Sequence, residues 1–234
     1  MNNTQTAERL ERLLGLKGHA VAIAFVEEPP AGVPRVEKSG PASCSYWTQA
    51  TEGASFYTEA ADHLKCPIGA HTHAVAMPPE TAAELQAMAG QMISLQYLRA
   101  EEIPSIPVRR TPFQKAVYAP LAKIGSAPDV VIVRGNARQI MLLTEAAQSA
   151  GIAAQSAGIM TRPTCAFIPE AINTGRAVSS FGCIGNRVYT GLADAELYFA
   201  TPGAKLGELL AALETIVAAN TVLEQFHLAR RASA

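Results

Sequence analysis

Hydrophobic residues follow two different spacings along this chain, one typical of helices and one typical of strands. Apolar positions recur every three to four residues in four segments, which predict helices over 4–14, 80–98, 137–150 and about 203–230. Gly15 stands where the first of these helices would end, and Asn136 is a natural N-cap for the third. Short β-branched and apolar runs predict strands over 19–26, 115–121, 129–134, 187–192 and 196–200.

The order of these elements predicts the fold class. Strands alternate with helices, which favours an α/β or α+β architecture. Pro104, Pro107 and Pro112 predict an extended connector between two halves of the chain. We therefore expect one compact domain over 1–234 that contains two similar lobes.

Composition narrows the class of protein further. The 234 residues are 49% hydrophobic and only 17% charged, which favours a folded protein that buries much of its surface, and we expect a homo-oligomer. A net charge of −1 argues against a general nucleic-acid binder. The N-terminal segment lacks the pattern of a secretory signal, and we expect a cytoplasmic protein with no membrane attachment.

The cysteines form a repeated pattern. Each half has a cysteine, an alanine six positions later, a glycine nine or ten positions later, and a second cysteine with a glycine just beyond it. The two sets are Cys44, Ala50, Gly53, Cys66 and Gly69, and Cys165, Ala171, Gly175, Cys183 and Gly185. This pattern predicts an internal repeat over about 18–75 and 127–190. The alternative is that the cysteines are small buried apolar residues and that the alignment is chance.

If the two lobes bring their cysteines together, the site is a soft metal centre. Thiolates bind zinc and iron–sulfur clusters, and the ligands would be Cys44, Cys66, Cys165 and Cys183. We expect an iron–sulfur cluster rather than zinc, with a redox or small-molecule role. The spacing differs from that of zinc ribbons and ferredoxins, because each ligand would come from a different loop.

Histidines lie close to Cys66 in the sequence. His71 and His73, in an extended segment, would point to the same side and could join Cys66 as metal ligands. The alternative is that these histidines are solvated or bonded to a neighbouring carbonyl. A third possibility is thiol catalysis, in which Cys66 is a nucleophile helped by His71 or His73.

Glycines beside the cysteines indicate a possible ligand site. Gly69, Gly182 and Gly185 would let the backbone approach a cofactor closely, and Arg187 follows as a cation that could hold a carboxylate or phosphate. The corresponding function is that of a non-catalytic binding or sensor protein for a small ligand, such as a tetrapyrrole or another anionic molecule.

Several segments together resemble one family. The segment from Pro128 to Met141, with Asn136 and Gln139, and the loop from Ser180 to Arg187 are similar to the bacterial and archaeal family named domain of unknown function 169. The resemblance covers roughly residues 10–215. It implies a single compact domain with shared cysteine positions and implies no substrate.

Overall fold

One mixed sheet organises the chain. The computed structural model describes residues 2–37, 40–153, 159–160 and 162–233. The strands in this part of the chain are β1 (Val21–Val26), β2 (Phe56–Glu59), β3 (Lys115–Pro120), β4 (Val130–Asn136), β5 (Ile159–Met160), β6 (Val178–Ser180) and β7 (Glu196–Pro202). Their order is β2-β3-β1-β4-β7-β6-β5, and every neighbouring pair is antiparallel except β5–β6.

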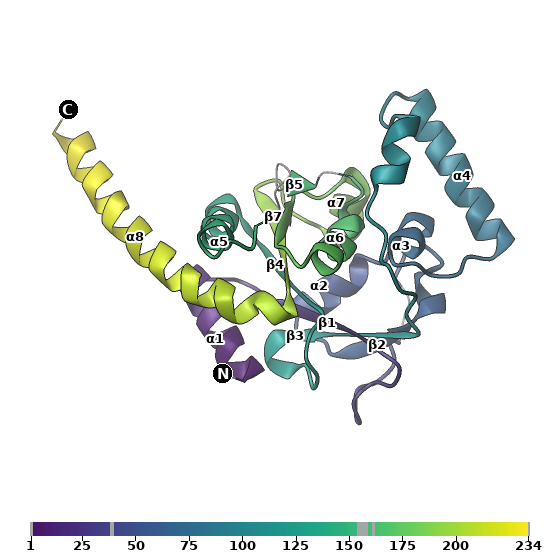
Figure 1. Ribbon diagram of the computed structural model, residues 1–234, viewed down its shortest axis with the longest axis horizontal. Coiled ribbons are helices and arrows are strands. Elements are labelled where there is room, and N and C mark those ends of the chain that lie inside the picture. The colour runs from purple at the N-terminus through teal and green to yellow at the C-terminus, as the bar shows by residue number, and fades with distance from the viewer. Residues whose placement is uncertain (1, 38–39, 154–158, 161, 234) are drawn as a thin grey trace.

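Helices cover both faces of this sheet. The α-helices are α1 (Asn3–Leu14), α2 (Ser45–Thr51), α3 (Pro67–Thr72), α4 (Pro79–Ser94), α5 (Ala137–Ser149), α6 (Phe167–Thr174), α7 (Ile184–Thr190) and α8 (Leu206–Ala232). Single 3-10 turns are η1 (Ala60–His63), η2 (Ala100–Ser105), η3 (Leu121–Lys123), η4 (Thr164–Ala166) and η5 (Gly203–Lys205). Figure 1 shows α1, α5 and α8 gathered at one end of the molecule and α4 projecting at the other. The fold class is α+β, as the sequence predicts.

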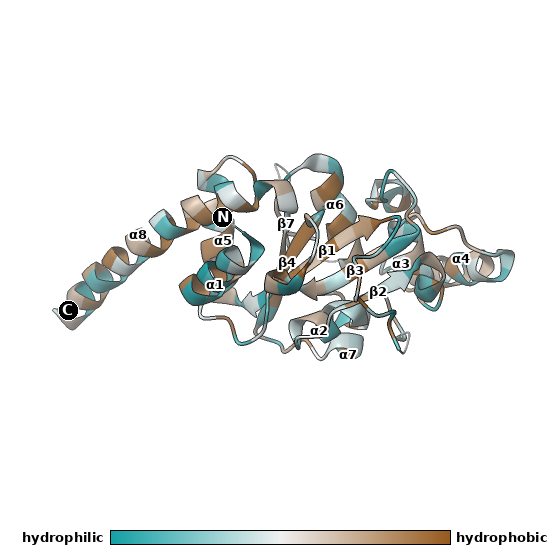
Figure 2. Cartoon of the chain, turned by 90° about the horizontal axis from the view of Figure 1, so that it is seen from below, coloured by the Kyte–Doolittle hydropathy of each residue, from teal (hydrophilic) through white to brown (hydrophobic). Residues whose placement is uncertain are grey.

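Alternation along the central strands divides the core into two clusters. On β1, Ala22 and Ala24 pack with residues of α1, α5 and α8, whereas Val21 and Ile23 pack with residues of α2 and α6. Successive side chains of β4 divide between the same two clusters. Figure 2 shows the brown, hydrophobic central strands lying between the two groups of helices. The cysteines and buried histidines belong to the face covered by α2, α3, α6 and α7.

The strand order is symmetric about the central pair. From β1 the sheet continues outward through β3 to β2, and from β4 it continues outward through β7 to β6. An internal repeat would produce this arrangement, but the repeat and the two similar lobes stay predictions.

Local signals explain where the helices begin and end. At α5 the Asn136 side chain accepts a hydrogen bond from the Gln139 amide (3.0 Å), and the Gln139 side chain accepts one from the Asn136 amide (2.8 Å). This capping box confirms the predicted N-cap. The strand predicted over 187–192 is wrong, because α7 is a helix that ends at the left-handed Gly191. Asn186 and Thr190 are buried four residues apart, which is helical spacing.

The C-terminal helix extends far beyond the sheet. Leu206, Leu209, Leu210 and Leu213 are buried in the core, whereas every residue from Thr221 to Ser233 is exposed. Among the described residues, the segment Gly203–Ala232 is long and apolar enough to cross a membrane by length and composition, and 22% of its most apolar window is buried. A helix in the core of a protein passes the same test, and the first third of α8 is buried in the core.

Candidate functional site

All four cysteines lie at or just before the start of a helix, on or beside one face of the sheet. Cys44, Cys66 and Cys183 are the N-cap residues of α2, α3 and α7, and Cys165 lies in η4 immediately before α6. Helix α7 packs against α2, and α3 packs against η4. All four are free thiols; Cys44 and Cys165 are buried, whereas Cys66 and Cys183 are partly exposed.

The two buried thiols are held in their neutral form. Burial raises the pKa of the Cys44 thiol to about 12, and the neighbouring Cys66 and Cys183 thiols add smaller contributions in the same direction. Burial likewise raises the pKa of the Cys165 thiol. Both thiols therefore stay protonated at neutral pH.

The predicted metal centre is wrong. In the part of the chain that the structure describes, no group of three or more histidine, cysteine, aspartate or glutamate side chains could hold a metal ion. The four cysteines stand at the starts of four different helices and are not gathered into one ligand set. The correction covers both the iron–sulfur and the zinc predictions, with the ligands Cys44, Cys66, Cys165, Cys183, His71 and His73.

Helical geometry also overturns the expected histidine pair. The segment around His71 is the helix α3, not an extended strand, and His73 is its C-cap residue. Two residues apart on a helix, side chains point in different directions. His71 is partly exposed, whereas His73 is 1% exposed and packs inside the protein.

A third histidine forms a hydrogen-bonded chain with two hydroxyl groups. His63 is 1% exposed; its Nδ1 lies 2.9 Å from Ser43 Oγ and its Nε2 lies 3.0 Å from Thr58 Oγ1. The Thr58 hydroxyl donates to the Ala116 carbonyl oxygen (3.4 Å), so it accepts from Nε2–H, and Nδ1 accepts from the Ser43 hydroxyl. Burial holds the pKa of His63 well below its usual value, and the imidazole is neutral at pH 7.

His73 lies beside this chain of hydrogen bonds. The His63 and His73 rings are stacked with their centroids 5.6 Å apart. Because His73 Nδ1 lies 2.9 Å from the Gly69 carbonyl oxygen, which can only accept, Nδ1 carries the proton. Its Nε2 is buried and has no hydrogen-bond partner among the described residues. Burial lowers the pKa of His73 to about 4.

Gly69 lies between Cys66 and the hydrogen-bonded chain. A Cβ atom at this position would lie against Ser43 Oγ and 3.0 Å from Cys66 Sγ. Cys66 Sγ and Ser43 Oγ therefore lie on either side of the position that a side chain at residue 69 would fill. The consequence is a partly exposed thiol beside a serine hydroxyl that is bonded to a neutral histidine.

The glycine loop before α7 is organised around its own arginine. Arg187 donates to the carbonyl oxygens of Phe181 (2.6 Å), Ala193 (3.0 Å) and Glu196 (3.3 Å). The guanidinium group of Arg187, which the sequence predicts to hold an anionic ligand, is therefore bonded to carbonyl oxygens of its own chain. Gly182 has a positive φ of 79°, and a Cβ there would lie 2.6 Å from the Leu192 side chain. Ligand binding by Gly69, Gly182, Gly185 and Arg187 stays a prediction.

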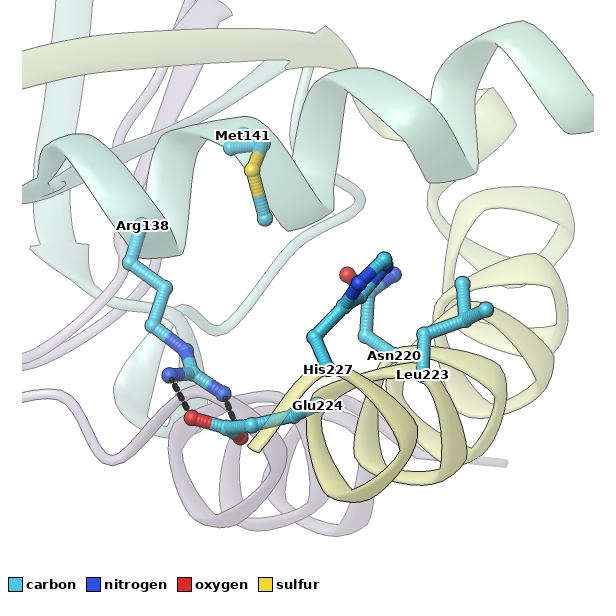
Figure 3. Close-up of a pocket in the computed structure, with 6 residues that line it drawn as sticks. All are labelled: Arg138, Met141, Asn220, Leu223, Glu224 and His227. Atoms are coloured by element: carbon cyan, nitrogen blue, oxygen red, sulfur yellow. Dashed lines mark hydrogen bonds and ion pairs between the residues drawn. The ribbon is translucent and has the colours of Figure 1, made fainter. Parts of the chain in front are cut away.

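A separate hollow lies between α5 and α8. It has a volume of about 300 Å³ and opens widely to solvent. Figure 3 shows Arg138 reaching across it to Glu224, with two bonds of 2.7 and 2.9 Å between them. This ion pair uses the charged groups of the hollow for contact between the two helices, and the hollow lies on the other face of the sheet from Cys66.

The sequence interpretation assigned no role to Ser43, Thr58 or His63. Ser43 stands next to Cys44, and His63 lies three residues before Cys66, so both were visible in the sequence. Their meeting depends on β2 and η1 turning His63 back toward the start of α2. That contact joins residues twenty positions apart and has no short-range signature.

The fold and the site define a class of protein: an α+β domain whose sheet carries free thiols and buried histidines on one helix-covered face. The sequence profile of the DUF169 family, described as "Uncharacterised ArCR, COG2043", matches residues 9–212, and the chain belongs to this family. The resemblance found in the sequence is thereby confirmed. No curated protein and no solved structure matches the chain. The family description assigns no activity, so function has to come from the geometry of the site.

Proposed function

We propose that this chain is a thiol-dependent enzyme in which Cys66 attacks an electrophilic small molecule and the Ser43–His63 pair takes up the thiol proton. The observation that carries the proposal is the convergence of Cys66 Sγ and Ser43 Oγ at the bare face of Gly69. A nucleophile, a base and a group that orients the base are the parts that covalent catalysis needs.

The proton route follows from the hydrogen bonds. The Ser43 hydroxyl donates to His63 Nδ1, which is free to accept because burial keeps the imidazole neutral. As Ser43 passes its proton to His63, its oxygen receives the proton of Cys66. The thiolate electron pair then forms the bond to the substrate, the leaving group departs with the electrons of the broken bond, and the proton returns from His63 through the Ser43 hydroxyl to the leaving group. Thr58 keeps the imidazole in the orientation that accepts from Ser43.

The compartment belongs to the same proposal. A catalytic thiol has to stay reduced, and all four cysteines are free. Free thiols persist in the cytoplasm, where glutathione and thioredoxin keep cysteines reduced. We therefore assign the enzyme to the cytoplasm and a small molecule as its substrate.

Alkylation rates test the proposal, because Cys183 is a matched control for Cys66. Both are partly exposed N-cap residues of short helices, and the Ser43–His63 pair is beside Cys66. We expect iodoacetamide at pH 7 to modify Cys66 at least about tenfold faster than Cys183, as measured by mass spectrometry of tryptic peptides over time.

Two variants test whether the alkylation rate of Cys66 depends on the hydrogen bonds of Ser43, His63 and Thr58. Ser43→Ala removes the hydroxyl, and Thr58→Val keeps the volume but removes the group that orients His63. Each is expected to lower the Cys66 rate toward that of Cys183 while leaving the Cys183 rate unchanged, with circular dichroism confirming the fold. Equal rates for the two cysteines in the wild-type protein, or a folded Ser43→Ala protein with an unchanged Cys66 rate, would overturn the proposal.

A further inference from the structure

A buried tyrosine connects the two segments that carry Ser43 and His63. Tyr46 lies in the first turn of α2 and is fully buried. Its backbone N–H donates to the Ser43 carbonyl oxygen (3.4 Å), and its phenol hydroxyl donates to the Asp62 carbonyl oxygen (2.9 Å). Asp62 is the residue before His63 in η1. One residue therefore links the start of α2 to the backbone immediately beside the imidazole.

The Tyr46 ring also contacts the imidazole itself. The ring centroids of Tyr46 and His63 are 5.2 Å apart, and the two ring planes are inclined by 64°. This is the edge-to-face arrangement that aromatic rings prefer. Phe113 makes a second contact of the same kind with His63, with the centroids 5.3 Å apart. These ring contacts restrict the tilt of the imidazole, whereas the Tyr46 hydroxyl holds the backbone that carries it.

The turn that carries His63 is tied to other parts of the chain as well. The Asp62 carboxylate accepts a hydrogen bond from the Glu59 amide (2.8 Å) and pairs with Arg35 (3.1 Å). These bonds give η1 a fixed shape, but neither of them reaches α2. Among the described residues, the bond from the Tyr46 hydroxyl is the one hydrogen bond between α2 and η1.

We propose that Tyr46 is a positioning residue for the proton transfer from Ser43 to His63, an inference that rests on the function proposed above. The transfer requires Ser43 Oγ to stay within hydrogen-bond reach of His63 Nδ1, and the two atoms are 2.9 Å apart. Without the phenol hydroxyl, η1 is no longer bonded to α2, and the average distance between these two atoms increases. A misplacement of about 1 Å can slow such a step by about a hundredfold.

Tyr118 provides a matched control within the same aromatic cluster. It is fully buried, and its ring centroid lies 5.6 Å from that of Tyr46 and 6.4 Å from that of His63. Its hydroxyl has no hydrogen-bond partner among the described residues. Tyr118→Phe therefore removes the same atom from similar surroundings without breaking a hydrogen bond, whereas Tyr46→Phe breaks one.

NMR of isotope-labelled imidazole nitrogens tests the positioning without reference to Cys66. In the wild-type protein Nε2 of His63 carries the proton and Nδ1 accepts from Ser43, so the two nitrogens should give well-separated signals. We expect Tyr46→Phe to bring these signals closer together, because a loosened imidazole exchanges between its two tautomers. Tyr118→Phe should leave them as in the wild type. Unchanged His63 signals in Tyr46→Phe, or equal changes in both variants, overturn the proposal.

Alkylation by iodoacetamide at pH 7 measures the consequence for the thiol. We expect Tyr46→Phe to lower the modification rate of Cys66 by about fivefold and to leave the rate of Cys183 unchanged. Tyr118→Phe should change neither rate, and circular dichroism confirms that both variants fold.

Failure of the proposed function has a different signature from failure of this inference. If wild-type Cys66 reacts no faster than Cys183, the thiol-dependent enzyme is refuted, and the His63 signals alone decide the role of Tyr46. If wild-type Cys66 is the faster thiol and Tyr46→Phe leaves its rate unchanged, the role of Tyr46 is refuted and the proposed function stands.

Discussion

The stability of this protein should fall with pH in a window that His73 defines. The imidazole is fully buried; its Nδ1–H donates to the Gly69 carbonyl oxygen, and its Nε2 has no partner in the described part of the chain. Protonation of Nε2 would create a charge in a site that cannot solvate it. Burial accordingly lowers the pKa of His73 from 6.5 to about 4, and the positive charge of Arg109 contributes in the same direction.

The sign and size of the effect follow from proton linkage. Below pH 6.5 the unfolded chain takes up a proton at this histidine, whereas the folded protein takes it up only near pH 4. The stabilisation is therefore complete above pH 6.5 and is lost as the pH falls toward 4. At 1.36 kcal/mol per pKa unit, the loss attributable to His73 is about 3 kcal/mol in the free energy of unfolding. His63 adds a loss of the same sign, because burial also lowers its pKa.

Urea unfolding at pH 7, 6 and 5 measures this loss. His73→Asn removes the titrating group and keeps an amide that can donate to the Gly69 carbonyl oxygen. We expect the difference in unfolding free energy between wild type and His73→Asn to shrink by about 2 kcal/mol between pH 7 and pH 5. His71→Asn, on the same helix but partly exposed, controls for the loss of a histidine. If wild type and His73→Asn lose stability in parallel, His73 does not titrate as the burial argument requires.

Two further predictions concern the scaffold, each measured by chemical denaturation. Gly203→Ala should destabilise the protein by about 3 kcal/mol, because the added Cβ would overlap the Pro128 carbonyl oxygen. Gly207 lies in α8 with nothing within 4 Å of the position of its Cβ, so Gly207→Ala should stabilise the protein by about 1 kcal/mol. Equal effects of the two variants would contradict the steric argument. Asn136→Ala should cost about 1 kcal/mol by removing the α5 capping box, and Asn136→Ser should recover most of it; a neutral Asn136→Ala change would refute the capping role.

Strong local patterns predicted the scaffold. The central strands β1 and β4 are short runs of apolar residues that are buried on both faces, and such runs need no long-range information to be recognised. The start of α5 was visible in the sequence because Asn136 and the residues after it satisfy each other's hydrogen bonds locally. The alternation of Val188 and its neighbours misled the prediction, since in α7 Val188 faces solvent while Asn186 and Thr190 face inward.

The metal prediction failed for a different reason. Cysteine spacing records how far apart residues are along the chain but not where folding places their side chains. The structure puts the four cysteines at the starts of four different helices, and no set of metal ligands forms among the described residues.

Burial decides what chemistry this face can perform. Low polarity raises the pKa of a thiol and lowers the pKa of an imidazole, so Cys44, Cys165, His63 and His73 are all held in their neutral forms at pH 7. A neutral imidazole bonded to a hydroxyl keeps a lone pair that can accept a proton, although burial makes His63 a weaker base than a solvated histidine. A substrate from solution can therefore reach a thiol only where this buried face of the protein borders on solvent. Cys66 occupies that place, beside Ser43, which is why its reactivity relative to Cys183 reports on the whole arrangement.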